Sequence, residues 1–280
     1  MIKFVYNRKE YTLDELINDY NTFSREVELP NDLTEYSILK PEILIVDKGY
    51  AISVGKLDEL YGMIASARNA LILSYQKFYD SNIISFESGE IGQLWMRAEY
   101  LKNAIVWYNS CEDYIYQIIW FAYELHGKSI SNREEYEKAL KECTYGKVKN
   151  KVGEFNNENS KLLLELINNY RNDDQVKYLR ENLANNLKHR ANLAFEELYS
   201  EDIMTVYDGS LNISEIVKPN LVSIDETIDI VKSVHIKLVK LARDIKEYIN
   251  FTGMLVFNSK GEIDPFKHND KPCYRKLMKE

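Results

Sequence analysis

The stretch Asn182-Leu183-Ala184-Asn185-Asn186-Leu187-Lys188-His189-Arg190 lies in the middle of a long segment that contains neither glycine nor proline. Asn182, Asn186 and His189 recur at i, i+4 and i+7, which places them on one polar seam of a helix. An apolar stripe lies beside this seam and comprises Val176, Leu179, Leu183, Leu187, Ala191, Ala194 and Leu198. The pattern predicts an amphipathic helix from Asp173 to Tyr199 with one packed face and one polar face.

His189 is the best single candidate for chemistry in this sequence. Histidine is the side chain whose ordinary pKa lies near neutrality, and Lys188 and Arg190 flank it here. Asparagine is a poor residue for a helix interior because its amide competes for backbone groups, so the three asparagines of the seam need an explanation. A solvated helix face is the alternative to a functional seam.

Composition favours a soluble, helical protein. Hydrophobic residues make up 45% and charged residues 29% of the 280-residue chain, as in ordinary globular proteins. All five prolines lie outside residues 42–218, which predicts long helices because proline disrupts a helix interior. The length permits one extended domain or two smaller ones.

Charge and cysteine content limit the classes of function. A net charge of −8 repels a polyanion, so binding of nucleic acid requires a local basic patch. The three cysteines lie far apart without a CxxC pair, which fits a reducing compartment and gives no zinc site. The first residues lack the apolar run of a signal peptide, and no stretch of about 18 apolar residues occurs. A cytoplasmic location without membrane association is the simplest expectation.

We expect residues 1–56 to form a mixed α/β extension. Residues 2–6 are typical of a strand, and Thr12 with Glu15 matches a capping box that opens a helix to about Phe23. Two apolar runs, at 43–46 and 50–54, flank Asp47-Lys48-Gly49 and predict a small hairpin.

Residues 57–250 are predicted to form a helical bundle. Its helices are expected at 57–79, 91–126, about 131–143, 160–170, 173–199 and 223–249, with a loop or frayed helix at 145–159. Residues 251–280 are expected to form a hairpin and a tail, and the hairpin strands at 254–257 and 261–263 could pair with the N-terminal strand. The fold class is therefore mainly α, with small β-strand additions from both terminal segments.

Common catalytic motifs are absent. The chain contains no GxxxxGK[ST], GxGxxG, HExxH or GxSxG pattern, so no cofactor is expected. Lysines form the one local basic patch that we nominate for a phosphate backbone, although such lysines are most often a solvated face. The RNA-binding candidates are Lys147, Lys149, Lys151, Lys177 and Arg190, with Lys188 beside them.

For the other histidines and for one polar set we predict roles other than catalysis. His126 is expected to play a local role at a helix C-terminus, where a cation favours the dipole, and His235 a satisfied core or edge role. Asn109, Glu112 and Asp113 form a polar set at i, i+3 and i+4 that either faces solvent or orients a histidine from a neighbouring helix.

The chain resembles the HEPN superfamily of α-helical bundles, the higher-eukaryote and prokaryote nucleotide-binding domains. In that family a late helix carries an Arg followed after four to six residues by a His, often with Asn after the Arg and Lys before the His. The segment from Ala184 to Arg190 looks like an Arg-Asn-x-Leu-Lys-His-Arg form of the motif with its first residue changed. The likeness would cover residues 57–249 and implies a bundle of long antiparallel helices.

The resemblance implies a metal-independent endoribonuclease of a toxin or antiviral-defence system, acting as a homodimer on RNA, with a protein partner or antitoxin. His189 would move a proton during attack by a ribose 2′-hydroxyl, with Asn185, Asn186 and Lys188 as supporting groups. The alternative is a catalytically silent module for dimerisation, partner binding or nucleotide sensing.

The motif arginine is missing from this chain. The three positions that could hold it are Asn182, Leu183 and Ala184. Arg180 lies nine positions before His189, a rotation of roughly 900° that puts it on the opposite side of a straight α-helix. The missing arginine favours the silent module, while a partner protomer, Arg190 or Lys188 would have to supply the cation of an active enzyme.

Overall fold

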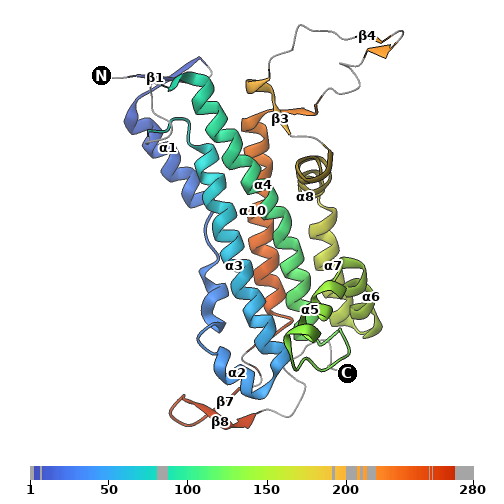
Figure 1. Ribbon diagram of the computed structural model, residues 1–280. Coiled ribbons are helices and arrows are strands. Elements are labelled where there is room, and N and C mark those ends of the chain that lie inside the picture. Colours follow the sequence, from blue (N-terminus) through green and yellow to red (C-terminus); the bar gives the residue numbers. More distant parts are fainter. Residues whose placement is uncertain are drawn as a thin grey trace. The chain divides into compact units, whose positions relative to one another are not determined.

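The structure is a computed structural model, and it describes residues 3–6, 8–80, 88–190, 193–199, 207–208, 211–212, 219–251, 253 and 255–268. Within these ranges the side chains at positions 42, 45, 46, 189, 190, 207, 208, 211, 212 and 263–268 lie outside the description. The protein is mainly α-helical with a few short strands, which confirms the predicted fold class at that level (Figure 1).

Two compact units share the chain. Unit 1 comprises Met1–Glu28, Ser66–Tyr108 and Asp174–His235, and unit 2 comprises Leu29–Ala65, Asn109–Asp173 and Ile236–Glu280. Three helices contribute residues to both units: α3 (Lys48–Tyr75), α4 (Gly89–Ala122) and α10 (Ile224–Lys246). The units therefore alternate along the sequence, whereas the predicted domains follow one another.

In unit 1 the chain starts with a strand pair and a helix. Strand β1 (Phe4–Tyr6) pairs antiparallel with β2 (Lys9–Tyr11), and α1 (Leu13–Glu26) follows. The predicted capping box is confirmed, because the Thr12 side chain accepts from the Glu15 backbone and the Glu15 side chain accepts from the Thr12 backbone. Figure 1 shows α1 beside the C-terminal part of α3, where the Phe23 and Tyr75 rings stack with centroids 3.9 Å apart.

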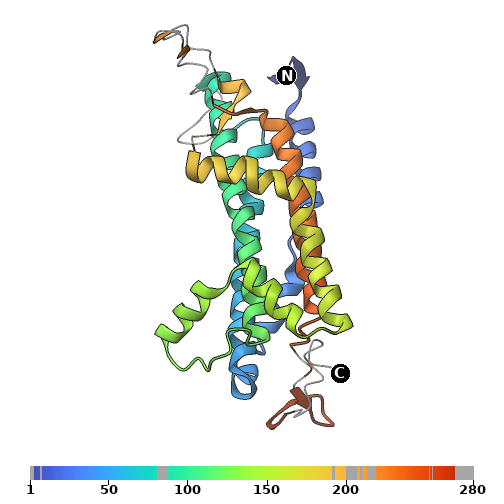
Figure 2. The same cartoon turned by 90° about the vertical axis from the view of Figure 1, so that its right-hand side faces the viewer.

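The predicted helix from Asp173 to Tyr199 is shorter and less regular than expected. It consists of α8 (Asp174–Tyr178), η3 (Leu179–Ala184) and η4 (Asn186–Arg190), and this segment crosses α10 in Figure 2. Strand β3 (Ala194–Phe195) then pairs in parallel with β6 (Leu221–Val222), followed by a 3₁₀ turn, η5 (Glu196–Leu198). The prediction of helix as far as Tyr199 is wrong, because strand pairing overrides the helical periodicity there. A further strand pair joins β4 (Tyr207–Asp208) and β5 (Leu211–Asn212).

The predicted hairpin between residues 43 and 54 is wrong. Unit 2 has a 3₁₀ turn, η1 (Asn31–Tyr36), followed by helix α2 (Lys40–Val46) and the start of α3 at Lys48. Pro41 occupies the first turn of α2, where its missing N–H costs nothing. Gly49 makes no hairpin turn, since a Cβ atom at this position would lie 2.8 Å from the Phe121 carbonyl oxygen. Glycine here allows two backbones to approach each other closely.

Three short helices complete the helical part of unit 2: α5 (Arg133–Glu142), α6 (Tyr145–Glu154) and α7 (Glu158–Asn172). Helix α6 replaces the predicted loop or frayed helix at 145–159. Its N-terminus is capped by the Thr144 hydroxyl, and Val148 and Val152 are buried at i and i+4. The Trp120 indole N–H donates to the Ala139 carbonyl oxygen over 3.0 Å and so fixes α5 against α4.

The predicted terminal hairpin is confirmed, with β7 (Leu255–Phe257) antiparallel to β8 (Ile263–His268). In the described residues β1 pairs with β2 instead, so the predicted pairing of the terminal hairpin with the N-terminal strand is wrong.

Apolar side chains of the long helices form the cores. In unit 1 Leu71, Leu101 and Val231 are fully buried, and in unit 2 Leu60, Ile119 and Leu238 are fully buried. Helices α3 and α4 run in opposite directions in unit 1 (Figures 1 and 2), so the end of α3 lies beside the start of α4. That junction carries the polar groups described below.

Candidate functional site

The segment formed by residues 174–190, here called the motif segment, has a π-helical backbone over most of its length. The structure assigns π-helix to Leu179–Ala184 and to Asn186–Arg190, and the Asn185 N–H donates to the Arg180 carbonyl oxygen five residues back. Because i→i+5 bonding turns the chain less per residue than an α-helix does, the α-helical projection does not describe this stretch. The rotation calculated for a straight α-helix therefore does not show where Arg180 lies relative to His189.

Burial divides the motif segment into an anchoring face and an accessible face. Four predicted stripe residues are placed as expected or nearly so: Val176, Leu179 and Leu183 are buried, and Leu187 is half-buried. Two others differ, because Ala194 and Leu198 are half-buried outside the helix. The last, Ala191, lies outside the described residues.

The accessible face carries the candidate polar groups. Asn185 and Asn186 are half-buried, and Lys188 is exposed. The Asn186 amide donates to the Asn182 carbonyl oxygen over 2.5 Å, a side-chain bond that competes with the regular helical pattern. The backbone of His189 and Arg190 belongs to η4, and their side chains lie outside the described residues.

Two of the three positions where the family motif could carry arginine are unsuited to a cation here, whereas the third, Asn182, is exposed. Leu183 and Ala184 are both 0% exposed, so a guanidinium replacing either would enter the core. Arg180, the nearest preceding arginine, forms an ion pair with Glu181 at 3.4 Å.

The predicted RNA-binding lysines belong to two different units. Lys177 is exposed on α8 in unit 1, whereas Lys147, Lys149 and Lys151 are exposed on α6 in unit 2. Two of the α6 lysines have carboxylate partners, with Lys147 3.8 Å from Glu142 and Lys151 2.9 Å from Glu154.

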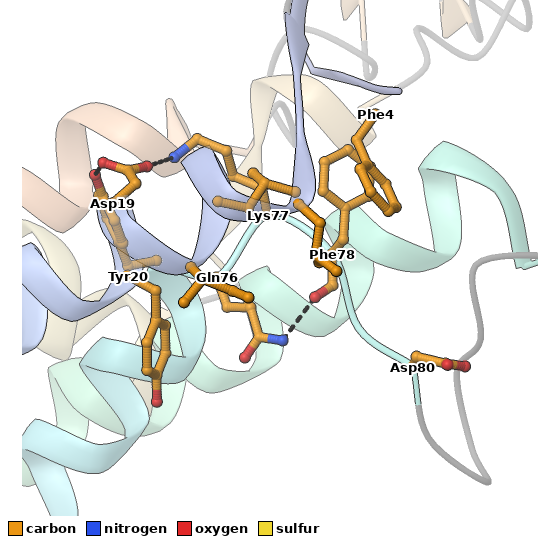
Figure 3. Close-up of a pocket in the computed structure, with 11 residues that line it drawn as sticks. Phe4, Asp19, Tyr20, Gln76, Lys77, Phe78 and Asp80 are labelled. Atoms are coloured by element: carbon orange, nitrogen blue, oxygen red, sulfur yellow. Dashed lines mark hydrogen bonds and ion pairs between the residues drawn. The ribbon is translucent and has the colours of Figure 1, made fainter. Parts of the chain in front are cut away.

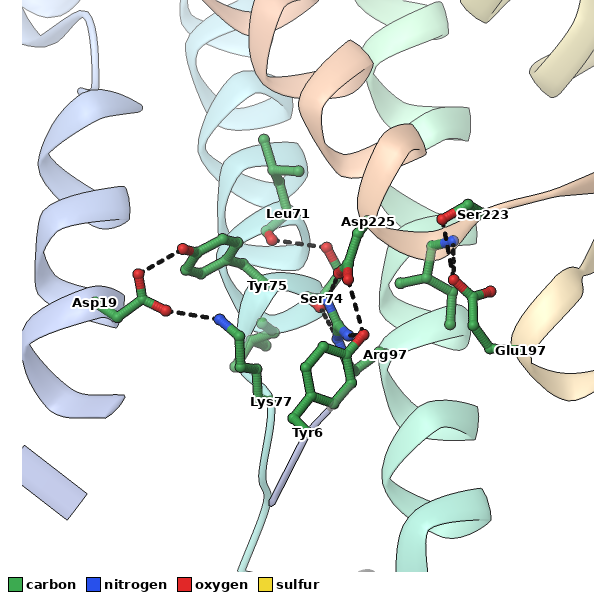
Figure 4. A network of polar contacts seen from close by, with 12 residues as sticks. Tyr6, Asp19, Leu71, Ser74, Tyr75, Lys77, Arg97, Glu197, Ser223 and Asp225 are labelled. Carbon is green, nitrogen blue, oxygen red and sulfur yellow. Dashed lines mark hydrogen bonds and ion pairs between the residues drawn. The ribbon is translucent and has the colours of Figure 1, made fainter. Parts of the chain in front are cut away.

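Contacts with α10 hold both ends of the motif segment. At its start, the Ser233 hydroxyl donates to the Gln175 side chain. Beyond its end, the Glu197 carboxylate accepts from the Ser223 hydroxyl at 3.0 Å and from the Ile224 N–H at 2.8 Å (Figure 4). Glu197 thus caps the N-terminus of α10, where a negative charge is favourable.

A pocket of about 320 Å³ opens in unit 1 between α1 and the segment that follows α3 (Figure 3). Its walls are mostly apolar and aromatic, and they include Phe4, Leu16, Ile17, Tyr20 and Phe78. No sequence pattern predicts this pocket, because its two sides are separated by more than fifty residues in the chain.

Three polar side chains of the pocket lining contact one another (Figure 4). The Lys77 ammonium lies 2.6 Å from the Asp19 carboxylate and 4.4 Å from the centre of the Tyr75 ring, and the Tyr75 hydroxyl donates to Asp19 over 2.7 Å. Partial burial raises the pKa of the Asp19 carboxyl, but the hydrogen bonds from Lys77 and Tyr75 outweigh burial and lower the pKa below its usual value.

A second cluster ties four elements of unit 1 together: β1, α3, α4 and α10. Arg97 of α4 is 1% exposed, and it donates to the Tyr6 hydroxyl of β1, to the Ser74 carbonyl oxygen at 2.8 Å and to Asp225 of α10 at 2.6 Å (Figure 4). The Tyr6 hydroxyl donates to Asp225 over 3.0 Å. Burial, with Asp225 nearby, raises the pKa of Tyr6 to about 12. The phenol is therefore neutral near pH 7 and acts as a structural donor.

His235 is a satisfied core histidine, which confirms that reading of the sequence. It is 1% exposed, with Nδ1 2.8 Å from the Tyr108 hydroxyl and Nε2 2.9 Å from the Glu28 carbonyl oxygen. Because a carbonyl oxygen only accepts, the proton is assigned to Nε2. Burial lowers the pKa of His235 to about 4, so the ring is neutral near pH 7.

The local role expected for His126 is confirmed, although its stated reason is wrong. The His126 Nδ1 accepts from the Lys128 N–H over 3.3 Å. Burial lowers the pKa of this imidazole, so the ring is neutral near pH 7 and does not supply the cation that we expected at the helix end.

The polar set on α4 divides between core and solvent. Glu112 is buried and accepts hydrogen bonds from Arg171 of α7 and from the Tyr116 hydroxyl, whereas Asp113 is exposed. Glu112 therefore belongs to a cluster with an arginine and a tyrosine of unit 2. The alternative in which the polar set orients a histidine stays a prediction.

Comparison of the chain with family models, with curated proteins and with solved structures gave no match. Among the described residues, no group of three or more His, Cys, Asp or Glu side chains is arranged to hold a metal ion. None of the described helices is both long enough and apolar enough to cross a membrane.

Proposed function

We propose that this protein is an RNA-directed module of HEPN-like type, in which His189 moves a proton during metal-independent cleavage of RNA. The observation that supports this proposal is the π-helical backbone of the motif segment. Such stretches are rare and occur frequently at functional sites. Here two π-helical stretches, Leu179–Ala184 and Asn186–Arg190, include nearly all the residues that carry the motif resemblance.

The residues that neighbour His189 in the sequence suit that chemistry. A neutral imidazole accepts the proton of a ribose 2′-hydroxyl, the oxygen attacks the adjacent phosphorus, and the departing 5′-oxygen takes up a proton. The exposed ammonium of Lys188 is the neighbouring cation that would stabilise charge on the phosphorus centre, and Asn185 and Asn186 would supply amide hydrogen bonds.

Cleavage of mixed structured RNA in the presence of a metal chelator tests the proposal. The wild-type protein and the His189→Ala variant are compared with His268→Ala, a matched control in the other unit. We expect cleavage by the wild type and the control, and a loss of roughly 100-fold or more in His189→Ala. Equal cleavage by all three proteins would overturn the assignment of His189.

The second candidate is a catalytically silent module that binds RNA or a protein partner. It is supported by the complete burial of Leu183 and Ala184, which occupy motif positions where an active member carries arginine. This candidate predicts no cleavage by any of the three proteins. It also predicts that Lys188→Gln weakens binding of a labelled RNA, whereas Lys161→Gln, at an exposed position on α7, leaves binding unchanged.

A further inference from the structure

One side of α1 forms a wall of the pocket in unit 1 instead of packing in the core. Leu13, Leu16, Ile17 and Tyr20 recur at i, i+3, i+4 and i+7, which is the spacing of a helix face that normally packs against a neighbour. Leu13 and Ile17 are nevertheless 54% and 50% exposed. An apolar stripe that lines a cavity offers a surface for a ligand.

The size and the opposite wall of the pocket define the ligand body. Phe4 and Phe78 form a tilted aromatic pair with centroids 5.0 Å apart, and both line the pocket (Figure 3). The volume of about 320 Å³ is at the lower end of the range found for small-molecule sites, which starts at roughly 300 Å³. One small molecule with an aromatic or branched apolar body fits this space.

The charges of the lining favour a cationic head group. Asp19 and Asp80 are the acidic residues of the lining and Lys77 is its basic residue, and Lys77 is paired with Asp19. Asp80 is exposed, lies two residues after Phe78, and has no ion pair among the described residues. An ammonium group gains both from a carboxylate and from the faces of aromatic rings. The Lys77 ammonium already occupies an environment of this kind, beside Asp19 and over Tyr75.

We propose that this pocket binds a small organic ammonium ion with an apolar body. The body packs between the α1 stripe and Phe78, and the ammonium lies beside Asp80. This site uses none of the residues assigned to RNA chemistry, so the proposal stands independently of the proposed function.

Three probes with the same body and different heads test the proposal: 3-phenylpropylamine, 3-phenylpropan-1-ol and 3-phenylpropanoate. We expect NMR titrations of the full chain at pH 7 to give the tightest binding for the amine, weaker binding for the alcohol and the weakest for the carboxylate. Equal dissociation constants for amine and alcohol, or tighter binding of the carboxylate, would overturn the assignment of a cationic ligand.

Two variants with matched controls locate the site. Asp80→Asn should weaken binding of the amine roughly two- to fivefold and leave the alcohol unchanged, whereas Asp229→Asn, on the exposed face of α10, should change neither. Ile17→Ser should weaken all three probes roughly tenfold. Its control is Ile236→Ser on α10, because both isoleucines are 50% exposed and neither substitution opens a core. Binding that is insensitive to Ile17→Ser would exclude this pocket.

Discussion

The two units contain the same combination of arginine, carboxylate and tyrosine with opposite burial. In unit 1 the Arg97 side chain is 1% exposed and its partner Asp225 is 45% exposed. In unit 2 the Arg171 side chain is 26% exposed and its partner Glu112 is 7% exposed. Loss of one partner is costly mainly when it leaves a buried charge uncompensated. In each pair, removal of the more exposed partner is therefore expected to lower the free energy of unfolding more than removal of the buried partner.

The largest difference in stability cost between the two partners of a pair is expected in unit 1. Asp225→Ala leaves the Arg97 guanidinium buried without its carboxylate and should lower the free energy of unfolding by about 3 kcal/mol. Arg97→Met leaves a carboxylate that water can reach, and it should cost less than half as much. Urea denaturation measures both, with Asp229→Asn as a surface control expected to change stability by less than about 0.5 kcal/mol. A larger cost for Arg97→Met would reverse the conclusion for this unit.

His235 extends the comparison to a buried group that is neutral. Its pKa is about 4 in the folded protein and near its usual 6.5 when unfolded, so the unfolded chain binds more protons between these values. Stability from this group is therefore complete above about pH 6.5 and falls as the pH drops towards 4, by about 2 kcal/mol between pH 7 and pH 5.

The His235→Gln variant isolates that contribution. Glutamine does not titrate, so its stability should depend less on pH than that of the wild type over the same window. Denaturation at pH 7, 6 and 5 gives the two profiles, and parallel profiles would show that His235 is not the group responsible.

In unit 2 the difference in stability cost is expected to be smaller, and here removal of the arginine costs more than removal of the carboxylate. Arg171→Met leaves the buried Glu112 carboxylate without its cation and should cost about 2 kcal/mol. Glu112→Gln keeps a polar group of the same shape, leaves a partly hydrated guanidinium, and should cost about 1 kcal/mol. Equal costs measured by urea denaturation would show that burial does not rank the two partners.

Features of the fold that depend on adjacent residues were predictable from sequence. The Thr12–Glu15 capping box and the terminal hairpin rest on short-range patterns, and the structure confirms both. The hairpin predicted at 43–54 failed because a short apolar run suits a strand or a buried helix equally well. The role of Gly49 depends on Phe121, which lies far away in the sequence.

The candidate sites show the same division. The spacing of Leu179 and Leu183 predicted their burial, but no residue pattern announced that the bonding would shift to i→i+5. Asp19 and Lys77 are 58 positions apart, so their pairing beside an apolar pocket became evident only in the fold. Residue spacing shows which side chains share one face of a helix. A pocket can be recognised only when the segment opposite that face is also known.

The alternation of the two units along the chain has a consequence for synthesis on the ribosome. Neither unit is complete without α10, since unit 1 includes its residues up to His235 and unit 2 its residues from Ile236 onward. A nascent chain that stops before α10 has the first two segments of both units and the complete form of neither. The apolar faces of α3 and α4 stay uncovered by α10 until α10 itself has been synthesised, which makes this interval the one in which a chaperone has most to protect.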